Sequence, residues 1–352
     1  MSKKTIENQR QLYESETKRI HAGYKIKMTI LILLTLLAAL FSFWIGYYPL
    51  PPREVVMAVL AGLGFQVEVI PQAMTIFWNI RLPRVLAALM IGASLSVSGS
   101  VYQGMFRNPL VSPDILGVSA GASMGAAISI FFGFPYWYTQ LFAFISGGAT
   151  VFLCYLISTK SVHSPTLSLV LTGSMIGTLC NAVVTMIKYL SDPNDVLQQL
   201  TFWLMGSLNK VRMDGLSMSA GPMLIGMAVI FLMRWRVNLL SLDEEEAQSL
   251  GINTKKYRII LITASTLLSA SAVCLGGLIG WVGLMIPHLC RVFFGPDYRR
   301  LVPACILMGG LYLLLMDDLA RALLTLELPI GVVTAFMGAP FFVGLILRRK
   351  DQ

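Results

Sequence analysis

The sequence predicts an all-α polytopic membrane protein with about ten transmembrane helices. The chain is 56% hydrophobic and only 13% charged, whereas soluble domains carry about 25% charged residues. Its mean hydropathy is +0.71. The hydrophobic residues also gather in uncharged runs of about 20 residues, which is the length of helix that crosses a hydrocarbon layer of ~30 Å.

These runs divide the chain into a tail and one membrane domain. We expect residues 1–27 to form a cytoplasmic N-terminal tail and residues 28–352 to form a single transmembrane domain. The predicted spans are residues 28–48, 85–106, 115–133, 138–159, 167–187, 215–233, two spans within 259–290, then 301–320 and 330–347. Two further apolar pieces, 53–65 and 199–208, are too short to span and are expected at the surface.

The run from Ile259 to Cys290 holds 32 residues, too many for one span and too few for two full ones. Its glycines, Gly276, Gly277, Gly280 and Gly283, mark the expected bend, so one of these two spans should be shortened.

The basic residues predict the orientation. With ten spans and the N-terminus inside, 20 of the 27 Lys and Arg residues fall in inner segments. Because cytoplasmic segments of membrane proteins are enriched in Lys and Arg, both termini are expected in the cytoplasm of a multi-pass protein of the cell (inner) membrane. The net charge of +9 does not indicate nucleic-acid binding, since the basic residues flank apolar runs rather than share one face.

No pattern in the chain is typical of an enzyme. The sequence has no P-loop, no HExxH motif and no Ser/His/Asp constellation. The three histidines, His21, His163 and His288, are far apart, and the five cysteines all lie inside apolar runs without a CxxC pair. We therefore expect no metal site and no cofactor, and we interpret the cysteines as small core residues.

The stretch from Arg81 to Gly125 is the most informative part of the chain. Two arginines bracket Pro83, an uncharged run of 22 residues follows from Val85 to Phe106, and two prolines then stop the helix. The run has a small-residue face, which lets helices approach closely in lipid. From its physical chemistry alone, this stretch is a membrane hairpin with charged ends.

Several motifs in this stretch resemble the FecCD-type permease family. They are Arg81-Leu82-Pro83-Arg84, Asn108-Pro109-Leu110, Pro113-Asp114-Ile115-Leu116-Gly117 and Gly121-Ala122. The family comprises the membrane subunits of ATP-driven importers for iron-siderophores, haem and vitamin B12, and the resemblance covers roughly residues 28–347.

The resemblance implies the fold and the partners. It implies a type II ABC importer permease fold, with residues 28–352 as the permease domain and alternating access as the mechanism. It also implies cytoplasmic ATP-binding subunits, an extracytoplasmic substrate-binding protein and a second permease subunit, in a homodimer or a heterodimer. The permease itself would be no enzyme, because ATP hydrolysis belongs to the separate subunits.

The resemblance also assigns roles to residues. It implies that the residues that couple to the ATPase are Leu242, Asp243, Glu244, Glu245, Glu246, Ala247, Leu250 and Gly251. Docking of the binding protein falls on Arg81, Arg84 and Arg321, and the gate or pathway on Ser164, Pro165, Thr166, Thr172, Ser174 and Asn181. Each role has a structural alternative. The polar segment can be an ordinary solvated loop, the arginines can pair with Asp317, Asp318 or Glu327, and the small residues of 167–187 can serve helix packing.

The expected cargo is a ferric siderophore, because Asp114 after Pro113 and the Arg107-Asn108-Pro109 form are nearer the siderophore members. Haem, cobalamin and oxyanion importers share the scaffold and remain alternatives. A secondary, ion-coupled transporter would need ionisable residues inside its spans, and an integral-membrane enzyme would need a catalytic cluster. A membrane anchor would need no docking features on both faces.

Overall fold

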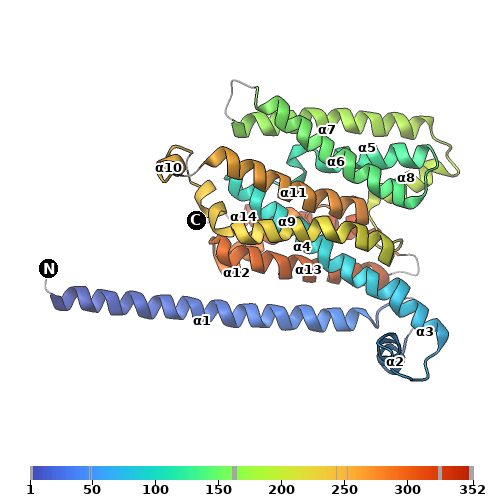
Figure 1. Ribbon diagram of the computed structural model, residues 1–352, viewed down its shortest axis with the longest axis horizontal. Helices are drawn as coiled ribbons and strands as arrows, with labels where there is room; N and C mark the ends of the chain where they lie inside the picture. The colour runs from blue at the N-terminus through green and yellow to red at the C-terminus, as the bar shows by residue number, and fades with distance from the viewer. Residues whose placement is uncertain are drawn as a thin grey trace.

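The chain forms a bundle of roughly aligned α-helices (Figure 1). The structure is a computed structural model that describes residues 3–46, 48, 50–160, 165–242, 244–251, 253–323 and 327–348. Side chains are described from residue 23 onward within these ranges, apart from residues 165, 166, 244, 245, 248, 345, 346 and 348.

The helices follow one another with short connections. They are α1 (Lys3–Ser42), α2 (Pro52–Gly62), α3 (Pro71–Ile76), the π-helical turn η1 (Phe77–Arg81), α4 (Leu82–Met105), the 3-10 turn η2 (Pro113–Leu116), α5 (Val118–Phe131), α6 (Tyr136–Ser158), α7 (Pro165–Leu190), α8 (Val196–Met205), α9 (Met213–Leu240), α10 (Glu244–Ser249), α11 (Thr254–Gly276), α12 (Val282–Phe294), α13 (Tyr298–Ala322) and α14 (Ile330–Arg348).

The predicted fold class is confirmed. Among the described residues, seven helices are long and apolar enough to cross a membrane by length and composition, and three shorter apolar helices accompany them. The shorter ones are Val118–Phe131, Val282–Phe294 and Ile330–Gly344. Every predicted span coincides with one of these helices, and the two short apolar pieces form α2 and α8.

Charged residues end the apolar runs without ending the helices. The helix α9 continues from the predicted end at residue 233 to Leu240, and α1 runs unbroken through the predicted boundary at residue 27. Lys and Arg are good helix formers, and their long side chains can keep the charged group in water. Within this extension of α9, the Arg236 guanidinium lies over the Tyr257 ring, 4.3 Å from its centroid.

The segment between α4 and α5 turns back into the bundle. After α4 ends at Met105, Arg107 adopts a left-handed conformation with φ of 50°. The chain then returns alongside α4, where Gln103 Nε2 donates to the carbonyl oxygens of Val111 (3.3 Å) and Leu284 (3.1 Å). Consequently α5 begins inside the bundle, and its 14 residues span only ~21 Å.

The break predicted between residues 276 and 283 is also present. Helix α11 ends at Gly276, and α12 begins at Val282 after a non-helical link. A Cβ atom added to Gly99 would lie 1.8 Å from the Gly283 carbonyl oxygen, and one added to Gly283 would lie 2.4 Å from Pro113. The start of α12, the last third of α4 and η2 therefore meet at one depth. Helix α12, at 13 residues, is the shortened span.

Helix α4 is the centre of the bundle and packs against α9, α11, α12 and α13. Its closest approach to α13 is at Gly92, where an added Cβ would lie 2.1 Å from the Gly309 carbonyl oxygen. The expected small-residue packing of this helix is therefore present. All five cysteines are buried in the core, as predicted.

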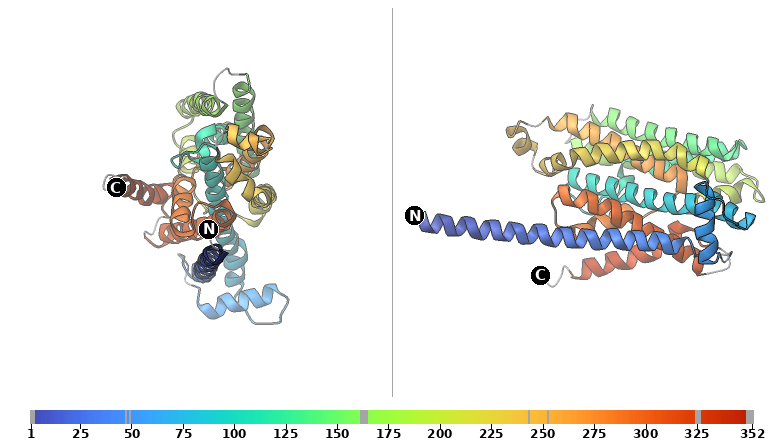
Figure 2. Two further views of the ribbon diagram at one scale, coloured as in Figure 1. Left: turned by 90° about the vertical axis from the view of Figure 1, so that its left-hand side faces the viewer. Right: turned by 60° about the horizontal axis from the view of Figure 1, so that its bottom comes forward.

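The two ends of the bundle differ. The start of α1, the start of α7, α10 and the end of α14 lie at one end, which we call the α10 end (Figures 1 and 2). At the opposite end lie α2, α3 and α8, and we call this the α2 end. The first part of α1 extends beyond the other helices at the α10 end (Figure 1).

Candidate translocation pathway and partner surfaces

The three predicted docking arginines are brought together at the α2 end, where they bind groups of the same chain. Arg84 holds two carboxylates. Its Nη2 lies 2.9 Å from Asp317 Oδ1, and its Nη1 lies 2.9 Å from Glu327 Oε2. Arg81 donates to the carbonyl oxygens of Phe43 and Tyr48.

Arg321 completes this arginine cluster from α13. Its Nε lies 3.1 Å from Asp317 Oδ2, and its Nη2 forms an ion pair with Asp318. The same nitrogen donates to Ser42 Oγ at 2.7 Å, and Ser42 Oγ donates to Asp318 at 2.6 Å. The cluster thereby ties the end of α1 to α4 and α13.

Burial decides what this cluster can do. Arg81 and Arg84 are 3% and 5% exposed, and the Asp317 side chain is fully buried. The Glu327 side chain, at 36% exposed, is the outermost carboxylate bound to Arg84. A partner's carboxylate would have to displace Asp317 or Glu327 to reach the Arg84 guanidinium. Arg84 and Arg321 therefore form ion pairs within the chain, which is the alternative considered from the sequence. Docking of a partner through the three arginines stays a prediction.

Exposed basic residues occupy the same end of the bundle. Lys210 and Arg212 lie just before α9, and Arg53 lies in α2. Sequence reasoning passed over them because they stand in connecting segments and not in a recognised motif. Their signal was the charge tally, since all three belong to the few basic residues expected outside.

The predicted coupling segment lies beyond the ends of α9 and α11 (Figure 1). It forms α10, a helix of six residues, followed by Gly251 with φ of 76°, a left-handed conformation that suits glycine after a helix. Ala247 is buried, whereas Leu250 is 59% exposed. Asp243 lies outside the described residues, and so do the side chains of Glu244 and Glu245.

The predicted gate lies at the same end as α10. Pro165 and Thr166 are the first residues of α7, whose start is at the α10 end (Figure 1). Ser164 lies outside the described residues, and the Pro165 and Thr166 side chains are not described either.

A polar cavity of about 710 Å³ opens between η2, α5 and α7. The predicted pathway residues Ser174 and Asn181 line it, and so do Asp114, Ser119 and Thr178. Thr172 is buried and does not line this cavity, and its predicted role on the pathway stays a prediction. Helical geometry explains its burial, because a residue two positions before Ser174 points about 160° away from it.

The polar residues of α7 form a stripe on its exposed side. Ser174, Thr178, Asn181 and Thr185 recur at the spacing of one helix face and are all exposed. Thr178 and Thr185 donate their hydroxyl protons to carbonyl oxygens one turn earlier, each at 2.9 Å. We call these four residues the α7 polar stripe. An aqueous route would favour such a stripe, whereas lipid tails offer it no partners.

The small residues of α7 serve packing instead. A Cβ atom added to Gly173 would lie 2.3 Å from the Ile115 carbonyl oxygen, so this glycine lets η2 approach the α7 backbone. The packing alternative therefore applies to Gly173, and a pathway role for the polar residues of 167–187 stays a prediction.

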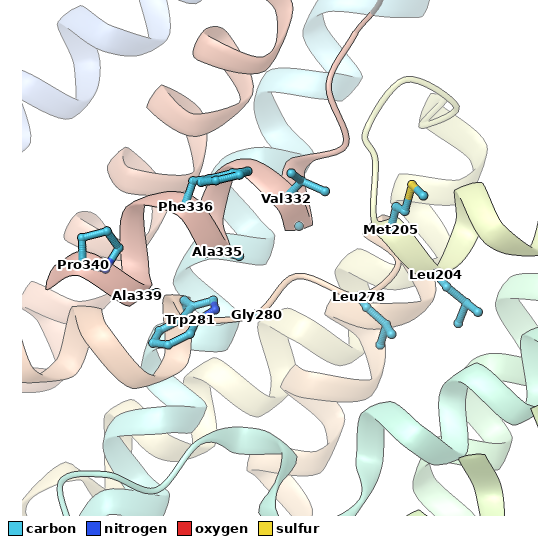
Figure 3. A pocket seen from close by; sticks show the side chains of 11 residues that line it. Leu204, Met205, Leu278, Gly280, Trp281, Val332, Ala335, Phe336, Ala339 and Pro340 are labelled. Carbon is cyan, nitrogen blue, oxygen red and sulfur yellow. The ribbon is translucent and has the colours of Figure 1, made fainter. Parts of the chain in front are cut away.

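A second cavity, of about 600 Å³, is apolar. It lies between α14, the end of α8 and the link before α12, and Figure 3 shows Trp281 opposite Val332, Ala335 and Phe336. Leu278 and Gly280 border both cavities. Its walls carry no charged side chain, so the polar cavity is the better candidate for a hydrophilic cargo.

The described residues contain no group of three or more His, Cys, Asp or Glu side chains that could hold a metal ion. The polar side-chain groups of the described residues that line the two cavities are hydroxyls, an amide, the Trp281 indole N–H and one carboxylate. What the arrangement can do is bind and pass a solute.

Comparison with known proteins agrees with this architecture. The chain is 39% identical over 320 residues to the molybdate import system permease protein MolB of Haemophilus influenzae, covering 91% of this chain and 95% of that protein. It is also 39% identical over 275 residues to an iron chelatin transport system permease protein of Helicobacter pylori, covering 78% of this chain and 83% of that protein.

A solved structure shares the fold. It represents an inward-facing conformation of a transporter assigned to the metal-chelate type of ABC transporter. The TM-score is 0.83 with 38% sequence identity, over 92% of this chain and 99% of that one. The profile of the FecCD transport family matches residues 32–348. The chain is thus a polytopic permease of an ABC importer, and it belongs to the FecCD transport family.

Proposed function

We propose that this permease passes a ferric siderophore across the cytoplasmic membrane by alternating access. The observation that carries the proposal is the polar cavity of about 710 Å³, bordered by the α7 polar stripe within an otherwise apolar bundle. Its volume falls in the range of ~300–1,000 Å³ that is typical of pockets for small organic molecules. The form of the Arg107–Asp114 segment favours a siderophore as cargo.

Molybdate is the second candidate cargo. The similarity to MolB extends over 91% of this chain and supports an oxyanion. Haem and cobalamin importers share the scaffold and stay as further alternatives. These cargoes differ in charge, which makes the chemistry of the cavity the feature that can separate them.

We further propose that the α10 end is cytoplasmic and receives the ATP-binding subunits. The excess of basic residues in the segments at this end supports the orientation, and with it both termini would be cytoplasmic. Directly after α10, the exposed Leu250 and the tight turn at Gly251 offer a small protruding surface for a cleft in a partner. Closure of the ATP-binding subunits would move α10 and, through α9 and α11, the bundle.

The substrate-binding protein would dock at the α2 end. Each of Arg81, Arg84 and Arg321 binds groups of its own chain. In this proposal they support docking indirectly, by fixing the positions of the segments that form the docking surface. The exposed Lys210 and Arg212 would meet acidic groups of the partner and steer its approach. A second permease subunit, identical or related, would face the exposed α7 side and enclose the route.

The test is ATP-dependent uptake by the complete importer in proteoliposomes. The full-length chain, its ATP-binding subunits and its binding protein should take up radioactive iron supplied as a ferric siderophore only when ATP is present. Uptake driven by an ion gradient without the ATP-binding subunits would contradict the proposal and favour a secondary transporter. ATP-dependent uptake of molybdate but not of iron would support the importer function and would identify molybdate, not a siderophore, as the cargo.

Coupling through α10 has its own test. Leu250→Asp should reduce recovery of the ATP-binding subunits with the tagged permease, because a charge enters an exposed apolar contact. Leu63→Asp is the matched control, since Leu63 is 67% exposed and follows α2, at the opposite end. Equal recovery with both variants would remove α10 from the proposed contact.

A further inference from the structure

One carboxylate of the polar cavity has no role in the preceding proposals. Asp114 lies in η2, the turn that re-enters the bundle, next to Pro113, which packs on Gly283. Gly283 in turn packs on Gly99, which lies in the last third of α4, ~9 Å before the end of the helix. Asp114 therefore sits inside the end of the bundle and not in a loop outside it.

Asp114 lines the cavity, and no basic side chain of the described residues forms an ion pair with it. Its side chain is exposed, and it is the single charged residue among the described residues that line the cavity. Its carboxylate accepts a hydrogen bond from the Ser119 hydroxyl, which orients it. At the α2 end, Arg84 and Arg321 are engaged with Asp317, Asp318 and Glu327 instead.

An ionisable group at this depth is costly unless it is paired or hydrated, and such groups in membrane proteins mark solute pathways. Asp317 illustrates the paired case, because two arginines neutralise it in the core. Asp114 illustrates the other case, in which the charge is left open to the cavity. Its field therefore acts on whatever occupies the cavity.

We propose that Asp114 selects cargo by charge, admitting neutral or cationic metal chelates and disfavouring anions. This inference rests on the proposed function, since it takes the polar cavity as the route of the cargo. At a distance of ~8 Å and an effective dielectric constant of ~20 to ~80, one unit charge changes the local concentration of an ion by roughly two- to thirtyfold. A ferric chelate of three hydroxamates is neutral, whereas one of three catecholates and molybdate are both multiply negative.

The charge preference can be measured without knowing the cargo. Ser174→Cys places a thiol in the same cavity, on the residue after Gly173, whose backbone touches η2. The full-length chain in nanodiscs is then treated with two methanethiosulfonates of similar size, one carrying a trimethylammonium group and one a sulfonate. The five native cysteines are buried, and their residual labelling is measured in the unsubstituted chain.

The cationic reagent should react faster relative to its intrinsic thiol reactivity, and adding Asp114→Asn should lower the cation-to-anion ratio at least about fivefold. Asparagine keeps the size of the side chain and an acceptor for Ser119. Thr185→Cys, on α7 but outside the cavity lining, should show a ratio that Asp114→Asn leaves unchanged. An unchanged ratio at Ser174→Cys would overturn the proposal.

A transport measurement separates this inference from the proposed function. In proteoliposomes with the complete importer, Asp114→Asn should raise the uptake of a ferric tris-catecholate relative to that of a ferric tris-hydroxamate. Failure of the unsubstituted importer to move any ferric chelate would contradict the siderophore function but would leave the labelling ratio as evidence for the charge preference. The uptake of molybdate can also be compared with that of the ferric tris-hydroxamate. A higher ratio of molybdate to hydroxamate uptake in the unsubstituted importer than in Asp114→Asn would overturn the inference itself.

Discussion

Helices α4 and α7 are both apolar, and both are long enough to cross a membrane, yet they sit in opposite surroundings. In the most apolar window of the helical stretch Pro71–Met105, 83% of the residues are buried, against 39% in the corresponding window of Leu167–Leu190. Hydrophobicity therefore does not distinguish a scaffold helix from one that borders the polar cavity. What distinguishes them is where the small and the polar residues stand.

On α4 the small residues are contacts between backbones. Gly92 and Gly99 bring α13 and α12 close enough that no side chain fits between them. On α7, Gly173 faces η2, and Ser174, Thr178 and Asn181 line the polar cavity. The same residue types thus build a rigid centre in one helix and a polar surface in the other.

The largest effect is expected where the α4 packing is broken. In Gly99→Leu the new side chain would start 1.8 Å from the Gly283 carbonyl oxygen, and a backbone atom cannot move aside without shifting α12. We expect little or no folded protein, measured by size-exclusion chromatography of the detergent-solubilised chain. Gly148→Leu on α6 is the control, because an added Cβ there meets nothing within 4 Å. Equal yields of the two variants would show that the α4 contact is not needed for folding.

The next effect concerns the ion pairs that end α4. Arg84→Ala leaves Asp317 with one arginine instead of two, in a site where the side chain is fully buried. Removing one partner of a buried ion pair costs about 3–5 kcal/mol, so the thermal unfolding midpoint in detergent should fall markedly. The double variant Arg84→Met with Asp317→Asn removes both charges and should recover much of the loss. No recovery would mean that the cluster acts through its shape and not through its charges.

The helices of this scaffold could be predicted from sequence because uncharged runs report span length directly. The predicted span 301–320 became α13, Tyr298–Ala322, and the glycines between 276 and 283 marked the break before α12. The start of α1 was placed too late and the end of α9 too early, because charge ends an apolar run while Lys and Arg continue a helix.

The contacts of the site could not be predicted in the same way. Arg84 and Asp317 are separated by 233 positions, and nothing in a single sequence pairs them. The return of η2 into the bundle depends on the space left by Gly99 and Gly283, which local patterns do not encode. Ser174 and Asn181 were identified among the residues that line the cavity, and Thr172 was not separated from them because the burial of each side of α7 was unknown.

A substitution in the α7 polar stripe is expected to change stability less than Arg84→Ala does, but to reduce transport strongly. Thr178 is exposed, and its hydroxyl is satisfied by the Ser174 carbonyl oxygen of the same helix. Thr178→Leu should therefore change the free energy of unfolding by less than about 0.5 kcal/mol, while ATP-dependent iron uptake falls several-fold because the polar stripe is interrupted. Leu179→Met, one residue along, is the control for both measurements. Unimpaired uptake in Thr178→Leu would remove the stripe from the route.

The smallest effect is expected at the exposed end of the arginine cluster. Glu327 binds the same guanidinium as Asp317, with Arg84 Nη1 2.9 Å from Glu327 Oε2, but its side chain is 36% exposed. Water screens such a pair, and exposed ion pairs contribute about 0–1 kcal/mol. Glu327→Gln should therefore shift the unfolding midpoint far less than Arg84→Ala, and the shift should shrink further in high salt. A decrease in the unfolding midpoint as large as that of Arg84→Ala would mean that Glu327 is closed off from water in the folded protein. The buried and the exposed parts of the arginine cluster would then not differ in their contribution to stability.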